Sequence, residues 1–163
     1  MNQPYPQSFD PRALRAALGE FATGVTVVTA RGLDGQPVGV TINSFASVSL
    51  EPPLVLWSLG LKSPSLAVFE TCSHYAVNVL AADQAELSQR FSQPQSDRFA
   101  GIDLIVGASG APLIPGCCAW FECRNEMHHP GGDHLILVGH VESFCRQEKP
   151  PLVFHGGLYR SLT

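Results

Sequence analysis

Two runs of strand-forming residues, joined by a short turn segment, limit the fold of this chain more than any other feature. Residues 118–127 and 134–146 are rich in aromatic and apolar side chains, and residues 128–133 between them contain a proline, two glycines and an aspartate. Such a segment favours a reversal of the chain, and the flanking patterns are typical of strands. The sequence therefore predicts a long antiparallel hairpin.

Shorter strand patterns occupy much of the remaining chain. The first two flank a turn at Asp34 and Gly35, and a nearly continuous apolar run follows Pro52 and Pro53, as expected of a buried strand. Two adjacent glycines allow a turn after the last strand pattern. The predicted strands are residues 25–30, 37–42, 54–58, 75–80 and 152–154.

Helix patterns are few and short. Asp10 followed by Pro11 predicts an N-cap and a first turn, with Gly24 as the end of that helix. Ser63 with Pro64 predicts the start of a second helix, and Asp83 that of a third. The first helix carries apolar residues at helical spacing, namely Leu14, Ala17, Leu18 and Phe21. The inner face of the second is expected to consist of Leu66, Ala67 and Phe69, and Leu87 and Phe91 are expected to pack on one side of the third.

The order of these elements favours one fold class. Six or seven strands with two or three short helices and no regular βαβ alternation favour a mainly β, antiparallel barrel over a doubly wound parallel sheet. Residues 93–116 are rich in Pro, Gly, Ser and Gln, and we expect them to be mostly loop with an extended piece at 102–106. The length of 163 residues suits a single domain over residues 1–163.

Charge and composition argue against several classes of protein. The formal net charge is −4 and the pI is about 5.8, so nothing favours binding to nucleic acid phosphates. The first residues lack the cationic start and apolar core of a secretory signal, and no window approaches the ~20 apolar residues of a membrane span. Five cysteines at irregular spacing argue for reduced thiols, and we expect a cytoplasmic protein.

Motifs of several other classes are missing or incomplete. The sequence contains no G-x-G-x-x-G between a strand and a helix, no P-loop and no G-x-S-x-G nucleophile elbow. A metal site is an alternative because Cys117, Cys118, Cys123, His128 and His129 lie close in sequence. Adjacent residues of a strand point to opposite faces, so core cysteines and turn histidines are the preferred interpretation, and we expect no metal.

A junction rich in hydroxyl and amide groups is the main candidate for ligand binding. Residues 41–49 follow an apolar strand pattern and carry threonine, asparagine and serine side chains, and Lys62 and Ser63 follow the next strand pattern. A phosphate needs several N–H or O–H donors and a fixed cation, and these two segments offer both. The same residues also suit a solvated lysine and hydroxyls that bond within their own loop, so spacing alone leaves both interpretations open.

Seven segments that occur in a fixed order carry a resemblance to a known family. They are FATGVTVVT at 21–29, GVTINSFASVSLEPPLVL at 39–56, YAVNVL at 75–80, GDH at 132–134, VGHV at 138–141, PLVF at 151–154 and GLY at 157–159. Over about residues 14–159 the chain resembles the short-chain flavin reductase family, the reductase components of two-component flavin-dependent monooxygenases.

The resemblance implies a split β-barrel that binds FMN or FAD, forms a homodimer and passes a hydride from NADH or NADPH to the flavin. Reduced flavin would then diffuse to a partner oxygenase. Carried over by motif, the residues at the flavin ring and ribityl chain are Thr41, Ile42, Asn43, Ser44, Phe45, Ser47 and Val48. Those at the flavin phosphate are Lys62, Ser63 and Pro64, with Phe91 nearby, and those on the nicotinamide side are His134, Phe154, Gly157 and Tyr159.

His134 is the residue that the resemblance places nearest to the chemistry. We expect it to orient the nicotinamide or to help supply the proton at flavin N1 or N5, and the alternative is a turn histidine that bonds to its own backbone. No covalent nucleophile is required, because the cofactors carry the redox chemistry. Trp57 is bulky for its strand position, which bears on the choice between FMN and FAD.

Two other functions stay open. One is a non-catalytic FMN-binding electron carrier on the same barrel, and the other is an interaction domain without flavin. The GDH and Gly-x-Tyr segments favour the reductase, because only a second ligand requires them.

Overall fold

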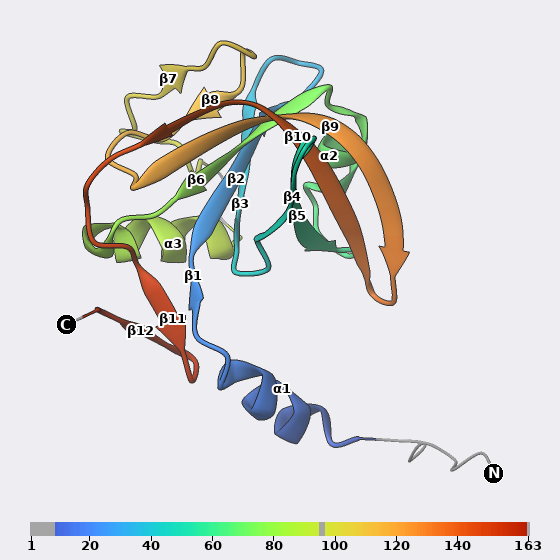
Figure 1. The fold of residues 1–163 in the computed structure, drawn as a ribbon, viewed down its shortest axis with the longest axis vertical. Helices are drawn as coiled ribbons and strands as arrows, with labels where there is room; N and C mark the ends of the chain where they lie inside the picture. The colour runs from blue at the N-terminus through green and yellow to red at the C-terminus, as the bar shows by residue number, and fades with distance from the viewer. Residues whose placement is uncertain (1–8, 95–96, 163) are drawn as a thin grey trace.

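A curved, seven-stranded antiparallel sheet forms most of the computed structural model, which describes residues 9–94 and 97–162 (Figure 1). The sheet curls into a barrel. Ser44, which follows the strand at one edge of the sheet, forms hydrogen bonds with the backbone of Ser58 in a strand near the other edge. The predicted mainly β, antiparallel fold with a few short peripheral helices is confirmed. In sheet order the strands are β3 (Pro37–Ile42), β2 (Thr26–Arg31), β6 (His74–Val79), β9 (Ala119–Gly131), β10 (His134–Arg146), β5 (Pro53–Gly60) and β4 (Ala46–Leu50).

Smaller elements surround this barrel in the described residues. One small sheet joins β1 (Thr23–Gly24), β11 (Val153–His155) and β12 (Leu158–Arg160), and a second joins β7 (Ile105–Val106) to β8 (Pro112–Leu113). The second sheet lies in the region predicted as mostly loop, and β7 falls within the expected extended piece. The helical segments are α1 (Pro11–Gly19), α2 (Leu66–Thr71), the 3-10 turn η1 (Ala82–Gln84) and α3 (Ala85–Ser92).

The long hairpin is present and exceeds its predicted length. β9 and β10 pair from His134 opposite Gly131 to Arg146 opposite Ala119. Only two residues form the turn, and Gly132 there has a φ of 66°, a left-handed conformation that glycine adopts without steric cost. Residues 128–131, predicted as turn, continue β9, because pairing with β10 outweighs their local turn composition.

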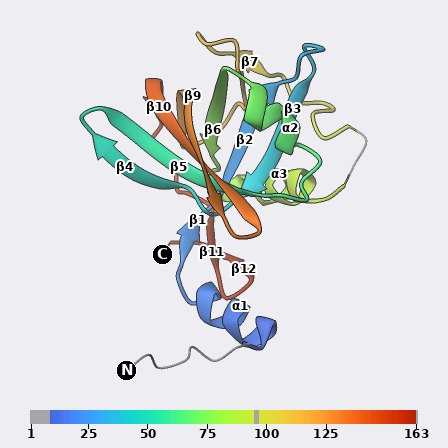
Figure 2. The same cartoon turned by 90° about the vertical axis from the view of Figure 1, so that its right-hand side faces the viewer.

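The hydroxyl-rich junction contains a strand that was not predicted from the sequence. Residues 43–45 leave the sheet, but β4 follows at once and pairs with β5 as an edge strand. Its small serine and alanine side chains give a weak strand pattern, and the open edge of β5 supplies the pairing that makes it a strand. The β4–β5 hairpin projects from the barrel in Figure 2, and Val48 and Leu50 are exposed.

The first helix begins as predicted but differs in length and packing. Asp10 caps it by accepting the Arg12 N–H, and Pro11 is its first residue. It ends at Gly19, because residues 23–24 are drawn into β1 by pairing with β11. Figures 1 and 2 show α1 standing away from the barrel, and the apolar residues Leu14, Leu18 and Phe21 are 47%, 67% and 78% exposed. The apolar stripe of this helix therefore does not pack into the barrel of its own chain.

The other two helices begin later than predicted. α2 starts at Leu66, and Ser63 Oγ accepts the N–H of Ser65 instead of capping a helix at its own position. α3 starts at Ala85 after the 3-10 turn, so Asp83 is not its cap. The prediction that Leu87 and Phe91 pack on one side is confirmed, because both belong to the same apolar cluster.

Apolar clusters cover both faces of the sheet, and β2 separates them. Val28 faces the barrel interior, together with Trp57, Phe69 and Tyr75, whereas Val27 faces the opposite cluster under α3.

All five cysteines are free thiols. No helix among the described residues is long and apolar enough to cross a membrane. The same residues contain no group of three or more His, Cys, Asp or Glu side chains arranged to hold a metal ion.

Candidate functional site

The end of β3 and the connection to β4 form one wall of a hollow that we call the serine–histidine hollow. Its volume is about 360 Å³. Ser44 Oγ accepts the N–H of Ser58 at 2.9 Å and donates to the Ser58 carbonyl at 3.2 Å, which fixes the connection against β5. The residues that line the hollow are Val40, Thr41, Ile42, Asn43, Ser44, Ser58, Leu59, Gly60, Ser63 and His134.

His134 enters this hollow from the first position of β10. It pairs with Gly60 across the ladder, and a methyl group at Gly60 would lie 3.9 Å from His134 Nε2. His134 Nδ1 is 2.7 Å from Asp133 Oδ1, so the ring is held by a neighbouring carboxylate and not by its own backbone. The hydrogen bond from His134 lowers the pKa of Asp133 below its ordinary value, and the positive charge of Lys62 acts in the same direction.

A second hollow, the tyrosine hollow, shares part of this wall and has a volume of about 310 Å³. Thr41, Ile42 and Asn43 line both hollows. Tyr159 lies at the other side of the tyrosine hollow, where its ring packs edge-on against Phe154 with centroids 5.8 Å apart. The full lining consists of Val25, Thr41, Ile42, Asn43, Ser88, Ser92, Phe154 and Tyr159.

The C-terminal hairpin brings Tyr159 to this position. Gly156 and Gly157 form its turn with φ values of 59° and 78°, which residues with a side chain rarely adopt. β11 pairs with β1, so Phe154 lies opposite Thr23 at the entrance to the barrel strands. Gly157 therefore allows the turn of the hairpin and does not line either hollow.

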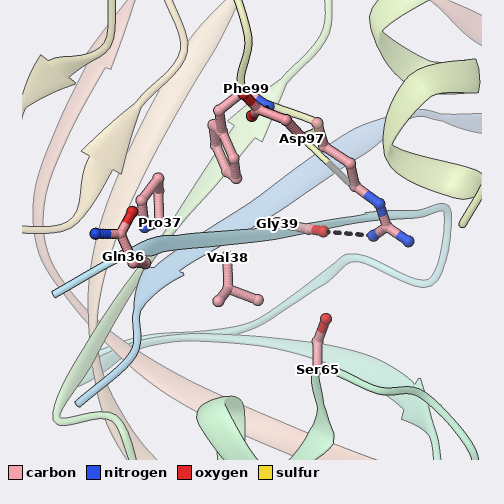
Figure 3. Close-up of a pocket in the computed structure, with 8 residues that line it drawn as sticks. Gln36, Pro37, Val38, Gly39, Ser65, Asp97 and Phe99 are labelled. Atoms are coloured by element: carbon pink, nitrogen blue, oxygen red, sulfur yellow. Dashed lines mark hydrogen bonds between the residues drawn. The ribbon is translucent and has the colours of Figure 1, made fainter. Parts of the chain in front are cut away.

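A third hollow, the arginine hollow, lies along the first half of β3 and has a volume of about 480 Å³ (Figure 3). Arg98 Nη1 donates to the Gly39 carbonyl at 3.0 Å, so a guanidinium group is fixed beside the strand. The arginine hollow adjoins the serine–histidine hollow, because Gly39 precedes Val40 and the Ser65 N–H bonds to Ser63 Oγ. Its lining residues are Gln36, Pro37, Val38, Gly39, Ser65, Asp97, Arg98 and Phe99.

The structure brings part of the predicted site together. Thr41, Ile42, Asn43, Ser44, Ser63 and His134 line the serine–histidine hollow, and Phe154 and Tyr159 line the tyrosine hollow. Phe45 packs against Phe121 with centroids 5.6 Å apart. Lys62 and Pro64 are next to Ser63 in the chain, and Ser47 and Val48 lie on the exposed strand β4.

Two bulky residues singled out from the sequence are core residues. Phe91 is fully buried under Gly39, where a methyl group would lie 2.8 Å from its ring, and it lines none of the three hollows, so its place near the flavin stays a prediction. Trp57 is also fully buried and packs edge-on against Phe69 inside the barrel. Trp57 therefore faces the barrel interior and lines none of the three hollows.

Three residues that shape the hollows were not predicted from the sequence. Ser58 receives the Ser44 bonds, Ser88 contacts Tyr159, and Arg98 bonds to β3. A signal existed for Ser88, because it lies beside Leu87 and three residues before Phe91, so a polar group falls on the packed side of α3. Arg98 lies in a segment without a motif, and only the folded chain places it next to Gly39.

Chemically, the hollows suit a flat ring with a polar and anionic extension. The serine–histidine hollow offers hydroxyl, amide and imidazole groups. Arg98 lines the arginine hollow together with Asp97, and Lys62 lines none of the three hollows but precedes Ser63 in the chain. Volumes of about 360 and 310 Å³ fall in the lower part of the ~300–1,000 Å³ range of small-molecule sites.

Comparison with known proteins yields one consistent group of relatives. The family described as "Flavin reductase like domain" matches residues 18–163. FMN reductase (NADH) SmoA of Agrobacterium fabrum is 47% identical over 94% of this chain and 87% of its own length. The flavin-dependent monooxygenase reductase subunit HsaB of Rhodococcus jostii is 42% identical over 96% of this chain and 80% of its own length.

Among solved structures, the NADH:FAD oxidoreductase SgcE6 of Streptomyces globisporus C-1027, in complex with NAD and FAD fragments, superimposes with a TM-score of 0.89. It is 39% identical, and the match covers 97% of this chain and 98% of that one. Some other curated relatives are longer proteins, of which this chain spans between 44% and 59%.

Proposed function

Because this chain belongs to the flavin reductase-like family, we propose that it is an NAD(P)H-dependent flavin reductase. It transfers a hydride from a nicotinamide donor to FMN or FAD and supplies reduced flavin to a partner monooxygenase. The names of the relatives support both parts, since SmoA is an NADH-dependent FMN reductase and HsaB is the reductase subunit of a flavin-dependent monooxygenase.

The observation that carries the proposal is the wall shared by two hollows. Hydride transfer requires the donor and acceptor rings to approach within about 3–3.5 Å, with water kept out. Thr41, Ile42 and Asn43 line both the serine–histidine hollow and the tyrosine hollow, so ligands in the two hollows would be neighbours. We assign the flavin to the serine–histidine hollow and the nicotinamide to the side that Tyr159 and Phe154 approach.

When bound, the flavin supplies the ring that accepts the hydride. The protein positions the two rings and sets the electrostatic field around them. Asn43, Ser44 and Ser63 are the polar residues that would hold the ring edge and chain. The Ser44–Ser58 bonds keep that wall rigid before a ligand arrives, which lowers the entropy lost on binding.

His134 lines the hollow assigned to the flavin, so of the two roles expected from the resemblance we assign to it the proton at flavin N1 or N5. Asp133 holds its Nδ1 side, which leaves Nε2 as the ring nitrogen directed over Gly60 into the hollow. The Asp133 side chain is 95% exposed, so this pair orients the ring only weakly, and Nε2 is able to donate or accept one hydrogen bond. Lys62 and Ser63 are assigned to the anionic tail of the flavin, with Arg98 as a second cation along β3.

The test is a turnover count with free flavin. The protein is mixed with a large excess of FMN and NADH, and absorbance at the nicotinamide band is followed. Many NADH molecules oxidised per protein support the reductase. A single stoichiometric bleaching of bound flavin supports the electron carrier, and a colourless protein without flavin affinity supports an interaction domain. Crossing FMN and FAD with NADH and NADPH then identifies the preferred pair.

We also propose a homodimer, supported by a row of aromatic rings that runs from the interior cluster to an exposed end. Phe45, Phe121 and Phe144 stack with centroid distances of 5.6 and 6.5 Å, and Phe45 and Phe121 pack against the cluster inside the barrel. Phe144 is 72% exposed and Leu50 on β4 is 90% exposed, so apolar side chains are available for contact with a second copy. Sedimentation of the wild type as a dimer and of Phe144→Asp as a monomer is expected, and a monomeric wild type at micromolar concentration would contradict the proposal.

Two further expectations complete the proposal. One domain over residues 1–163 is supported by the sharing of β2 between the two apolar clusters. A cytoplasmic location is supported by five free thiols, which oxidising compartments rarely preserve. Limited proteolysis and cell fractionation test these two points.

A further inference from the structure

A chain of hydrogen bonds crosses the tyrosine hollow through one buried residue. Ser88 Oγ lies 2.7 Å from the hydroxyl of Tyr159, and the Ser88 carbonyl accepts a hydrogen bond from Thr41 Oγ1, also at 2.7 Å. Ser88 itself is only 1% exposed, because it lies on the packed side of α3. A single residue therefore contacts both the C-terminal hairpin and the wall shared by the two hollows.

The C-terminal hairpin makes few other hydrogen bonds to the barrel, although Phe154 and Tyr159 pack against the apolar cluster under α3. β11 and β12 contain three residues each, and β11 pairs with only two residues of β1. Among the residues that the structure describes, the Ser88–Tyr159 bond is the only side-chain hydrogen bond between this hairpin and the rest of the chain. His155 and Glu20 add an exposed ion pair at 3.6 Å, which is worth little in water. A segment with so few hydrogen bonds to the rest of the chain opens locally more easily when one of them is removed.

We propose that Ser88 is a positioning residue for hydride transfer. Its hydroxyl holds the Tyr159 phenol at the nicotinamide side, and its carbonyl holds the Thr41 hydroxyl at the flavin side. One turn of α3 thus sets the spacing between the two ligand positions. This inference rests on the proposed reductase function and adds a residue to it, since Ser88 belongs to none of the motifs that carry the family resemblance.

The two links use different atoms, so they can be separated by substitution. Ser88→Ala removes the hydroxyl that bonds to Tyr159 but keeps the carbonyl that accepts from Thr41. Tyr159→Phe removes the same bond from its other end, at the partly exposed edge of the hollow. Thr71→Ala is the matched control, because Thr71 Oγ1 also bonds to a helix carbonyl, that of Ala67 in α2, and lines none of the three hollows.

The kinetic test is a double-mutant cycle on the full chain. A neutral hydrogen bond contributes about 0.5–1.5 kcal/mol, which corresponds to a factor of about 2 to 13. We therefore expect Ser88→Ala and Tyr159→Phe each to raise the KM for the nicotinamide donor about three- to tenfold. FMN affinity is expected to change less than twofold. The double variant is expected to match the larger single effect within about twofold, because both changes remove one bond. Thr71→Ala is expected to behave as wild type.

A second readout needs no activity. Hydrogen exchange of the amides at 153–160 in the ligand-free protein is expected to speed up in Ser88→Ala and in Tyr159→Phe, while the amides of β9 and β10 keep wild-type rates. Equilibrium titration with NAD⁺ is expected to show the same three- to tenfold loss as the KM. If Ser88→Ala fails to fold, Tyr159→Phe alone carries both measurements.

Several results would overturn the proposal. Unchanged nicotinamide affinity in both single variants, multiplicative effects in the double variant, or unchanged exchange at 153–160 would each remove Ser88 from the positioning role. Failure of the proposed function looks different, because the wild type would then oxidise no nicotinamide donor with either flavin. In that case the exchange measurement still decides whether Ser88 anchors the hairpin.

Discussion

Replacing Ser44 by alanine tests the wall on which both hollows depend. The β4–β5 ladder ends at Ala46 opposite Leu56, two residues before Ser58. Ser44 Oγ takes the place of the next backbone partner, since it accepts the Ser58 N–H at 2.9 Å and lies 3.2 Å from the Ser58 carbonyl. Alanine removes both bonds and leaves two partly buried backbone groups without these partners.

The magnitude follows from these two bonds. Each neutral hydrogen bond contributes about 0.5–1.5 kcal/mol, so we expect Ser44→Ala to lower the free energy of unfolding by about 1–3 kcal/mol. For a chain of this size that corresponds to a fall in Tm of about 2–10 °C. If half of this free energy is also lost from FMN binding, the affinity for FMN falls about two- to tenfold.

Two assays on the same samples separate these effects. Urea unfolding without flavin gives the change in stability, and quenching of FMN fluorescence gives the change in affinity. Ser49→Ala is the control, because Ser49 lies in β4 and its hydroxyl makes no hydrogen bond among the described residues. A Ser44→Ala protein with wild-type stability and wild-type FMN affinity would refute the claim that this contact shapes the site.

Three further outcomes are expected. His134→Ala should lower kcat/KM for the nicotinamide donor about five- to twentyfold, and unchanged NADH kinetics would remove His134 from the site. Burial raises the pKa of Cys117 and of Cys123 from 9.0 to about 12, so the folded state keeps both thiols neutral while the unfolded chain ionises above about pH 9. The stability that comes from keeping the two thiols neutral is present below pH 9 and is lost as the pH rises toward 12. The loss is about 1.4 kcal/mol per thiol for each pH unit. A Tm that stays constant from pH 8 to 10 would contradict this expectation. Cys145 is the exposed thiol, so a maleimide at pH 7.5 should label it first, and Cys145→Ser should remove the rapid phase.

Local patterns were sufficient to predict the fold class. The composition of residues 25–30, 37–42 and 75–80 predicted strands whose positions agree with the structure within one or two residues. The same reasoning failed for β4, whose serines and alanine carry little strand preference of their own. It also failed for residues 128–131, where turn-forming side chains lie in a strand. In both places a neighbouring strand, invisible to a local window, decides the conformation.

The helix at the start of the chain shows a different limit. Asp10 and Pro11 predicted its first turn correctly, and Leu14 and Leu18 predicted an apolar stripe that does exist. The stripe is exposed in the folded chain, because α1 stands away from the barrel. Periodicity identifies an apolar face but does not identify the surface that covers it, and a second copy of the chain is the occupant that the homodimer proposal supplies.

For the site, the sequence identified the residues that line the shared wall but not the residues that hold this wall in place. Thr41 to Ser44, Ser63 and His134 belong to motifs, and the structure gathers them around one hollow. Ser88 contacts Thr41, which lies 47 positions away in the sequence, and Arg98 contacts Gly39, which lies 59 positions away. Such contacts depend on the packing of α3 and the 97–99 segment against β3, which no spacing rule contains.

A crystal structure of the protein soaked with FMN tests the proposed flavin site most directly. We expect the isoalloxazine ring in the serine–histidine hollow, against Thr41 to Ser44 and beside His134, with its other face open toward Tyr159. Flavin bound elsewhere, or this hollow closed by its own side chains while the protein still turns over FMN, would contradict the assignment.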